Sequence, residues 1–68
     1  MLKLTLKEKE VLQLVGEYKT SKEIALQLKL SPRTIQSYLD NIYFKLNVKG
    51  HGARHQAYAA ALSANLLD

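Results

Sequence analysis

The side chains best suited to chemistry lie close together near the middle of this chain. They are Arg33, Gln36, Ser37 and Asp40. Gln36 and Asp40 are four residues apart, as are Arg33 and Ser37, and residues at this spacing are neighbours on the surface of an α-helix. Glutamine suits a paired contact with adenine, arginine suits guanine or a phosphate, and a carboxylate suits the amino group of cytosine. This group therefore predicts contacts with the base edges of DNA.

Hydroxyl and lysine side chains near the expected helix ends predict contacts with DNA phosphates. They are Thr20, Ser21, Lys22, Thr34 and Lys45. Phosphate contacts fix the register of a protein on the duplex without reading its sequence. The alternative is that Ser21 and Thr34 only cap helix ends and that Arg33 is a solvated surface charge.

The charge balance favours a partner that carries phosphates. Ten Lys and Arg residues face six Asp and Glu residues, which gives a formal net charge of +4 and a pI of about 9.5. A basic balance of this kind favours nucleic acid, although many small basic proteins bind none. We therefore expect double-stranded DNA as the partner, with RNA polymerase as a second candidate.

The base-reading residues need a helix that is held firmly against a core. Ser31 followed by Pro32 predicts a helix start, because the serine hydroxyl can cap the first amides and proline fits the first helical position. Apolar residues then recur at spacings of four, three and four, which predicts one buried stripe on a helix over 32–46. The stripe consists of Ile35, Leu39, Ile42 and Leu46.

A shorter helix and a tight turn precede this one. Thr20 or Ser21 is expected to cap the shorter helix, whose apolar face is Ile24, Ala25 and Leu28. The stretch from Lys29 to Ser31 is only long enough for a turn, with Leu30 filling the corner. A short helix, a three-residue turn and a longer helix are typical of a helix-turn-helix, in which the second helix enters the major groove.

Two flanking helices complete the prediction of an all-α, four-helix domain over 1–68. The first is expected at about 6–17, with a capping box from Thr5 and Glu8. Its apolar face is predicted to be Val11, Leu12, Val15 and Tyr18, and Gly16 is expected to mark its end. Alanine-rich sequence predicts a fourth helix from about 53 to 64. Asn65 is expected to turn left-handed there, so that Leu66 folds back on the helix.

Composition argues against several other kinds of protein. The chain has no cysteine and no apolar run near the roughly 20 residues that a membrane span needs. His51 and His55 have the spacing of two ligands on one helical face, but the glycines around His51 predict a loop there. We therefore expect no metal, no cofactor, no membrane association and no enzymatic activity, and we expect a cytoplasmic protein.

The chain resembles the LuxR/GerE-type helix-turn-helix domain from about residue 4 to residue 67. The matching stretches include Thr20-Ser21-Lys22-Glu23-Ile24-Ala25, Leu30-Ser31, Thr34-Ile35, Asn41-Ile42, Lys45-Leu46, Val48, Arg54-His55-Gln56-Ala57 and Ala64-Asn65-Leu66-Leu67. The resemblance implies that the third helix enters the major groove, with base contacts at Gln36, Ser37 and Asp40. It also implies phosphate contacts at Ser21, Lys22, Thr34 and Lys45.

The resemblance further implies dimers that pair through their fourth helices on two half-sites. Small side chains on or near one face of that helix would permit close approach while burying little area, so we expect a weak homodimer. They are Ala57, Ala60, Ala61 and Ala64. The chain departs from the family at Tyr18, where glycine is usual, at Tyr38, where histidine is frequent, and at Asp40, where a basic residue is frequent. The loop from Val48 to Arg54 is about three residues longer than usual.

Two other classes of protein remain open at the level of sequence. Region 4 of a sigma factor has a similar helix-turn-helix and binds promoter DNA and RNA polymerase, but it would normally lack the break before the fourth helix. A small helical bundle could also bind only protein. The sequence is equally compatible with a stand-alone regulator and with the C-terminal domain of a longer one.

Overall fold

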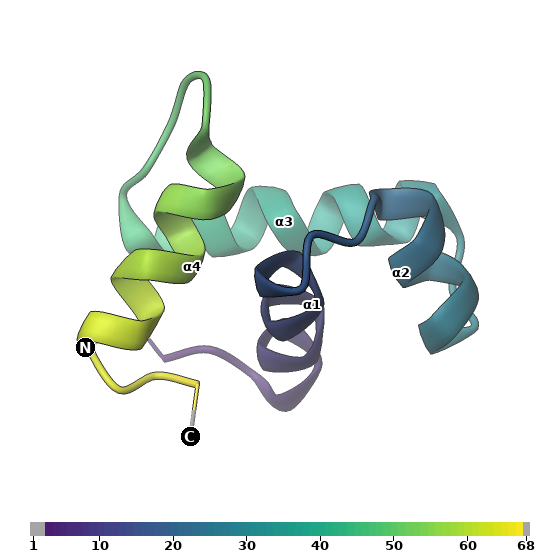
Figure 1. Cartoon of the computed structure of the whole chain (residues 1–68), viewed down its shortest axis with the longest axis horizontal. Coiled ribbons are helices and arrows are strands. Elements are labelled where there is room, and N and C mark those ends of the chain that lie inside the picture. Colours follow the sequence, from purple (N-terminus) through teal and green to yellow (C-terminus); the bar gives the residue numbers. More distant parts are fainter. Residues whose placement is uncertain (1–2, 68) are drawn as a thin grey trace.

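Four α-helices and no strand make up residues 3–67, the part of the chain that the computed structural model describes (Figure 1). They are α1 (Leu6–Gly16), α2 (Ser21–Leu28), α3 (Pro32–Leu46) and α4 (Ala53–Ser63). Helix α3 contacts the other three helices and crosses the molecule, with α2 at one end and α4 at the other. The all-α prediction is confirmed, and the observed bounds of α3 are the predicted ones.

The first three helices begin with the same capping arrangement. The hydroxyl oxygens of Thr5, Thr20 and Ser31 each accept a hydrogen bond of 3.1 Å from the backbone amide three residues later. Glu8 and Glu23 return the bond to the cap amide at 2.8 Å, which completes a capping box on α1 and on α2. Thr20 is therefore the cap of α2, and Ser21 is its first helical residue.

A residue with a left-handed backbone follows each of the four helices within two positions of its last residue, although none of these residues is glycine. They are Tyr18, Lys29, Asn47 and Asn65, with φ between 56° and 63°. The amide of the next residue in each case donates to the carbonyl oxygen five residues back, at 2.9–3.2 Å. This pattern closes a helix by satisfying one of its last free carbonyls. The predicted turn at Asn65, with Leu66 folded back, is confirmed.

The prediction that Tyr18 continues the apolar face of α1 is wrong. Helix α1 ends at Gly16, two residues earlier, and Tyr18 is 81% exposed. Its ring instead lies against that of His55 on α4, with 5.1 Å between the ring centroids. The backbone of Gly16 lies close to α4, because a Cβ atom at this position would overlap the ring of Tyr58.

The core forms where α3 meets the other helices. Its largest fully buried side chains are Leu12, Ile24, Ile35, Leu39, Ile42, Val11 and Val15. Ala25 is 2% exposed at the junction of α2 and α3, where a small side chain lets the two helices approach closely. The predicted stripe of α3 is thus buried at Ile35, Leu39 and Ile42 and only half-buried at Leu46. Within residues 3–67, the helices are too short or too polar for any to cross a membrane.

Candidate nucleic-acid interface

Helix α3 presents a polar face directly opposite its buried stripe. Arg33, Gln36, Ser37 and Asp40 are all exposed, as helical spacing predicts. The preceding turn holds this face in a fixed orientation, because the left-handed Lys29 ends α2 and the amide of Leu30 donates to Ala25 at 2.9 Å. The structure therefore brings the four residues onto one accessible surface. Their role in reading bases stays a prediction.

Two residues of this face are bonded to each other. The amide nitrogen of Gln36 donates to Oδ1 of Asp40 at 2.9 Å. This bond uses one of the two N–H groups of Gln36 and leaves its second N–H and its carbonyl oxygen free. Those two atoms are the pair that a contact with adenine needs. Asp40 therefore orients the glutamine side chain.

Four of the five residues expected to hold phosphates lie at the starts of α2 and α3. Lys22 is exposed, while Ser21 and Thr34 are half-buried. Thr20 accepts from the amide of Glu23, and the hydroxyl of Thr34 lies 2.9 Å from that of Ser31. Capping and phosphate binding are compatible at Thr20, because its hydroxyl accepts from the amide of Glu23 and still has a proton to donate.

Arg54 joins α4 to the start of α2, a contact that helical patterning did not reveal. Its guanidinium donates to Oγ of Ser21 at 2.6 Å and to the carbonyl oxygen of Lys19 at 3.2 Å. Since Ser21 accepts from Arg54, its own hydroxyl proton remains available to an outside acceptor. The partners are 33 and 35 residues apart in the chain, so only the tertiary fold could identify this pair.

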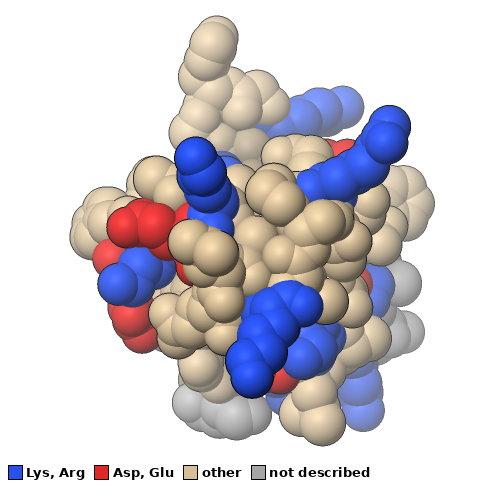
Figure 2. Space-filling view, turned by 90° about the vertical axis from the view of Figure 1, so that its right-hand side faces the viewer, with Lys and Arg blue, Asp and Glu red and all other residues tan. Residues whose placement is uncertain are grey.

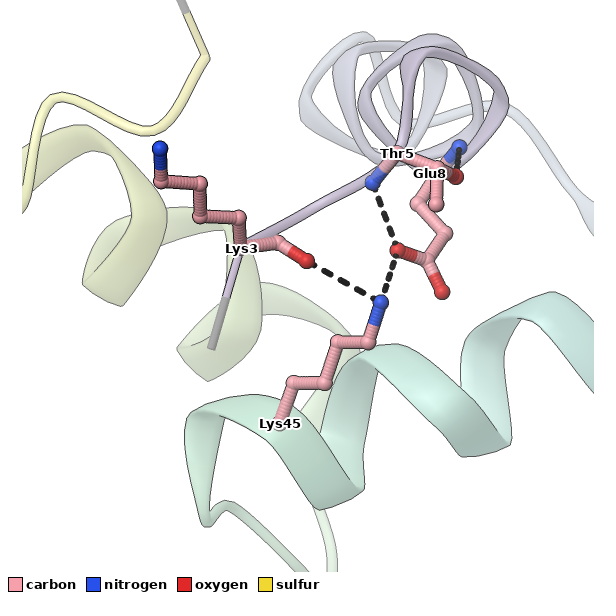
Figure 3. A network of polar contacts seen from close by, with 4 residues as sticks. All are labelled: Lys3, Thr5, Glu8 and Lys45. Atoms are coloured by element: carbon pink, nitrogen blue, oxygen red, sulfur yellow. Dashed lines mark hydrogen bonds and ion pairs between the residues drawn. The ribbon is translucent and has the colours of Figure 1, made fainter. Parts of the chain in front are cut away.

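Lys45, the fifth residue expected at a phosphate, is held within the fold instead. Its ammonium lies 2.6 Å from Oε1 of Glu8 and donates to the carbonyl oxygen of Lys3 at 3.0 Å (Figure 3). The same Glu8 oxygen accepts from the amide of Thr5. The side chain of Lys45 is 22% exposed and that of Glu8 is 5% exposed. These contacts favour a structural role for Lys45 over the predicted phosphate contact.

The charge of Glu8 depends on this network. Burial of the carboxylate raises its pKa, but hydrogen bonds from Lys45 and from the Thr5 amide, together with the ammonium charge, outweigh burial. The net effect lowers the pKa of Glu8 below its ordinary value of 4.5. The carboxylate is therefore ionised at neutral pH and pairs α1 with the end of α3.

The surface charge is distributed in a way that suits a phosphate backbone. On the end of the molecule where α2 and the start of α3 lie, separate Lys and Arg side chains project outward (Figure 2). Most of the acidic surface visible from this side lies toward the left margin of the view, and smaller acidic patches lie between the basic side chains. A positive surface of this kind attracts DNA at long range and without regard to sequence.

The expected dimer face on α4 needs a correction. Ala57 and Ala61 are 0% exposed and belong to the core of the single chain, so a second chain cannot contact them. Ala60 is half-buried, and Ala64 lies just beyond the helix. The exposed side of α4 instead carries His55, Ala59 and the 52% exposed Leu62. Spacing placed these alanines on one face, but it could not tell whether that face packs on the core of the same chain or on a second chain.

The remaining predicted positions are accounted for in the same way. His51 lies in the turn before α4 and His55 lies within the helix, so the two do not share a helical face. Within residues 3–67, no three His, Cys, Asp or Glu side chains gather in a possible metal site.

Two exposed residues of the α3 face were missed, Asn41 and the 80% exposed Phe44. Spacing of four and seven residues from Asp40 and Ser37 was the signal for Phe44.

Comparison with known proteins identifies similar sequences. Residues 2–60 match the family described as bacterial regulatory proteins, luxR family. The spore germination protein GerE of Bacillus subtilis (strain 168) is 40% identical over 65 residues, which cover 96% of this chain and 84% of GerE. No solved structure matched the chain.

Two further relatives are larger regulators that match over a shorter stretch. The transcriptional regulatory protein DesR of Bacillus subtilis (strain 168) is 48% identical over 46 residues, covering 68% of this chain and 23% of DesR. The uncharacterized response regulatory protein YgeK of Escherichia coli (strain K12) is 49% identical over 45 residues, covering 66% of this chain and 31% of YgeK. The matched stretch is therefore a minor part of both proteins.

Proposed function

This chain belongs to the luxR family of bacterial regulatory proteins and is a DNA-binding regulator of transcription, and from that premise we propose that α3 reads base edges in the major groove. One observation carries this proposal. The exposed face of α3 holds Arg33, Gln36, Ser37 and Asp40, while its opposite face is locked into the core behind a three-residue turn. A helix held in this way can enter the groove as a rigid unit.

The residues of the interface divide into two roles. Gln36 and Asp40 act as a bonded pair that contacts bases, with Ser37 and Arg33 beside them. Lys22, Thr34, Thr20 and Ser21 contact phosphates on either side, and Arg54 holds Ser21 in position. Lys45 is left out of the interface because its ammonium pairs with Glu8. The domain binds without catalysing a reaction, and the cytoplasm, where the DNA lies, is its proposed compartment.

Replacing Lys22 with alanine is expected to weaken binding to all duplexes alike. A lysine that neutralises a phosphate releases counterions, so its loss should reduce the slope of log K against log salt by about one unit. The measurement is a fluorescence anisotropy titration of a labelled duplex at several salt concentrations. Lys7→Ala is the matched control, because Lys7 already pairs with Glu10 at 3.4 Å and should leave the slope unchanged. An unchanged slope in Lys22→Ala would remove Lys22 from the interface.

We further propose that two copies pair weakly on DNA through the exposed side of α4. His55, Ala59 and Leu62 follow one another at intervals of four and three residues, so they form one face. This face is small and only partly apolar, and interfaces below about 1,200 Å² are typical of transient contacts. The isolated domain should therefore be monomeric in free solution and should pair when DNA carries two half-sites. RNA polymerase is the proposed second partner of the assembled regulator.

Leu62→Glu is expected to abolish cooperative binding to two half-sites while single half-site binding stays near normal. The physical reason is that a carboxylate at Leu62 would place two like charges at the contact without touching the core. Gel-shift titrations with one-site and two-site duplexes measure the difference. Ala61→Glu is the contrasting variant, since it buries a charge in the core and should unfold the domain. Equal losses on both duplexes in folded Leu62→Glu would place the dimer contact elsewhere.

A further inference from the structure

Phe44 is an exposed aromatic side chain on the groove-facing side of α3. It is 80% exposed, whereas α3 buries Ile35, Leu39 and Ile42 fully and Leu46 in part. It lies four residues after Asp40 and seven after Ser37, a spacing that places all three on one helical face. Single exposed apolar residues are ordinary at protein surfaces. This one is notable because the side chains around it on that face are polar.

The chemistry of the major groove supplies an apolar partner for such a side chain. Among the four bases, only thymine presents a methyl group in that groove, and phenylalanine is one of the side chains that contact it. We propose that Phe44 contacts the C5-methyl group of a thymine, and so extends base reading beyond the polar residues of α3. This inference rests on the proposed function, since it requires α3 to enter the groove.

The helix geometry indicates where that thymine should lie. Each residue advances an α-helix by about 1.5 Å, so Phe44 is roughly 6 Å beyond Asp40 along α3. Successive bases on one strand are about 3.4 Å apart. If α3 follows the groove, the thymine lies about two base pairs beyond the base that faces Asp40, toward the end of the half-site that meets the C-terminal turn of α3.

The test uses the whole chain and a duplex selected by it from a random pool. Each thymine of the selected duplex is replaced in turn by uracil, which lacks only the methyl group. For the wild type, uracil at one or two positions should weaken binding about fourfold, the effect of uncovering one methyl group. In Phe44→Ala the same uracil should change nothing. Because Phe44 is exposed, Phe44→Ala should melt at the wild-type temperature or slightly above it.

A matched control separates this contact from general surface hydrophobicity. Leu26 is 77% exposed on α2, so Leu26→Ala removes a comparable apolar side chain that is not on α3 and should keep the wild-type sensitivity to uracil. Wild-type binding that ignores every uracil, or Phe44→Ala that keeps the same sensitivity, would overturn the inference. The inference would also be overturned if the wild type associated with itself in the absence of DNA and Phe44→Ala did not, because Phe44 would then belong to a protein contact. If the pool yields no preferred duplex, the proposed function itself fails.

Discussion

Ile42→Ala is expected to lower the free energy of unfolding by about 2–5 kcal/mol, the usual cost of truncating a fully buried isoleucine. Ile42 is 0% exposed and lies on the inner face of α3, the helix that contacts all three others. A domain of this size has a total stability of only about 3–5 kcal/mol. The variant should therefore melt far below the wild type or show no cooperative transition at ambient temperature, and DNA binding should be lost with the fold.

Thermal melting followed by circular dichroism measures this effect. Asn41→Ala is the matched control, because Asn41 precedes Ile42 on α3 but is exposed, and alanine favours the helix. The control should melt close to the wild type. A melt of Ile42→Ala within a few degrees of the wild type would mean that α3 is not buried along this stripe.

Lys45→Met is expected to produce the second large loss, because it leaves the Glu8 carboxylate buried without its cation. Removing one partner of a buried ion pair lowers the free energy of unfolding by about 3–5 kcal/mol. Because the side chain of Lys45 is 22% exposed, we expect a loss toward the lower end of that range. Adding Glu8→Gln to Lys45→Met should recover part of the loss, because the unpaired charge is then gone. Urea denaturation of Lys45→Met, of Glu8→Gln and of the double variant at neutral pH measures the coupling.

The same pair makes a prediction about pH. The folded pKa of Glu8 lies below the ordinary value of 4.5, so its stabilisation is present above about pH 4.5 and is lost as the pH falls through the folded pKa. Glu8→Gln should lose less stability than the wild type over that acid range. Glu23 also has a lowered pKa, because its carboxylate accepts from the Thr20 amide, so Glu23→Gln is the comparison that isolates Glu8.

One outcome would contradict the structural role of Lys45. If Lys45→Met kept wild-type stability but reduced the slope of log K for DNA against log salt, Lys45 would belong to the DNA interface.

Local sequence signals were sufficient to predict the helices and their beginnings. Hydroxyl residues followed three positions later by glutamate, and serine followed by proline, specify a helix start through contacts within four residues. The apolar spacing of α3 contrasts strongly with its polar residues, so its buried face and its exposed polar face could both be predicted. The role of the exposed residues in reading bases stays a prediction.

Tertiary contacts account for what the sequence could not reveal. Lys45 resembles any basic residue of a DNA-binding helix until α1 brings Glu8 beside it from 37 residues away. Tyr18 has the spacing of a core residue, but α1 ends at Gly16 and Tyr18 takes a left-handed conformation beyond it. Spacing places Ala57 and Ala61 on one face of α4, but small side chains suit both a contact with the domain's own core and a contact with a second chain, and only the fold shows that they are buried in the core. Each of these errors arose where the same sequence pattern fits two different structural environments.

The bond between Gln36 and Asp40 changes how variants of the interface should behave. If the two acted independently, their effects on binding would add. Because Gln36 donates to Asp40, Asp40→Ala should also loosen the glutamine and weaken the preference at the base that Gln36 contacts. The double variant should then cost less than the sum of the single variants.

Selection of binding sites from a random duplex pool, carried out with the wild type and with Gln36→Ala, tests most directly whether α3 reads the DNA. The wild type should enrich a defined sequence, and Gln36→Ala should lose the preference at one base pair at a cost of about 1–3 kcal/mol for the preferred site. Its binding to unrelated duplexes should stay unchanged, because glutamine releases no counterions. Enrichment of the same sequence by both proteins, with every base preference retained, would contradict the account and place recognition outside the α3 face.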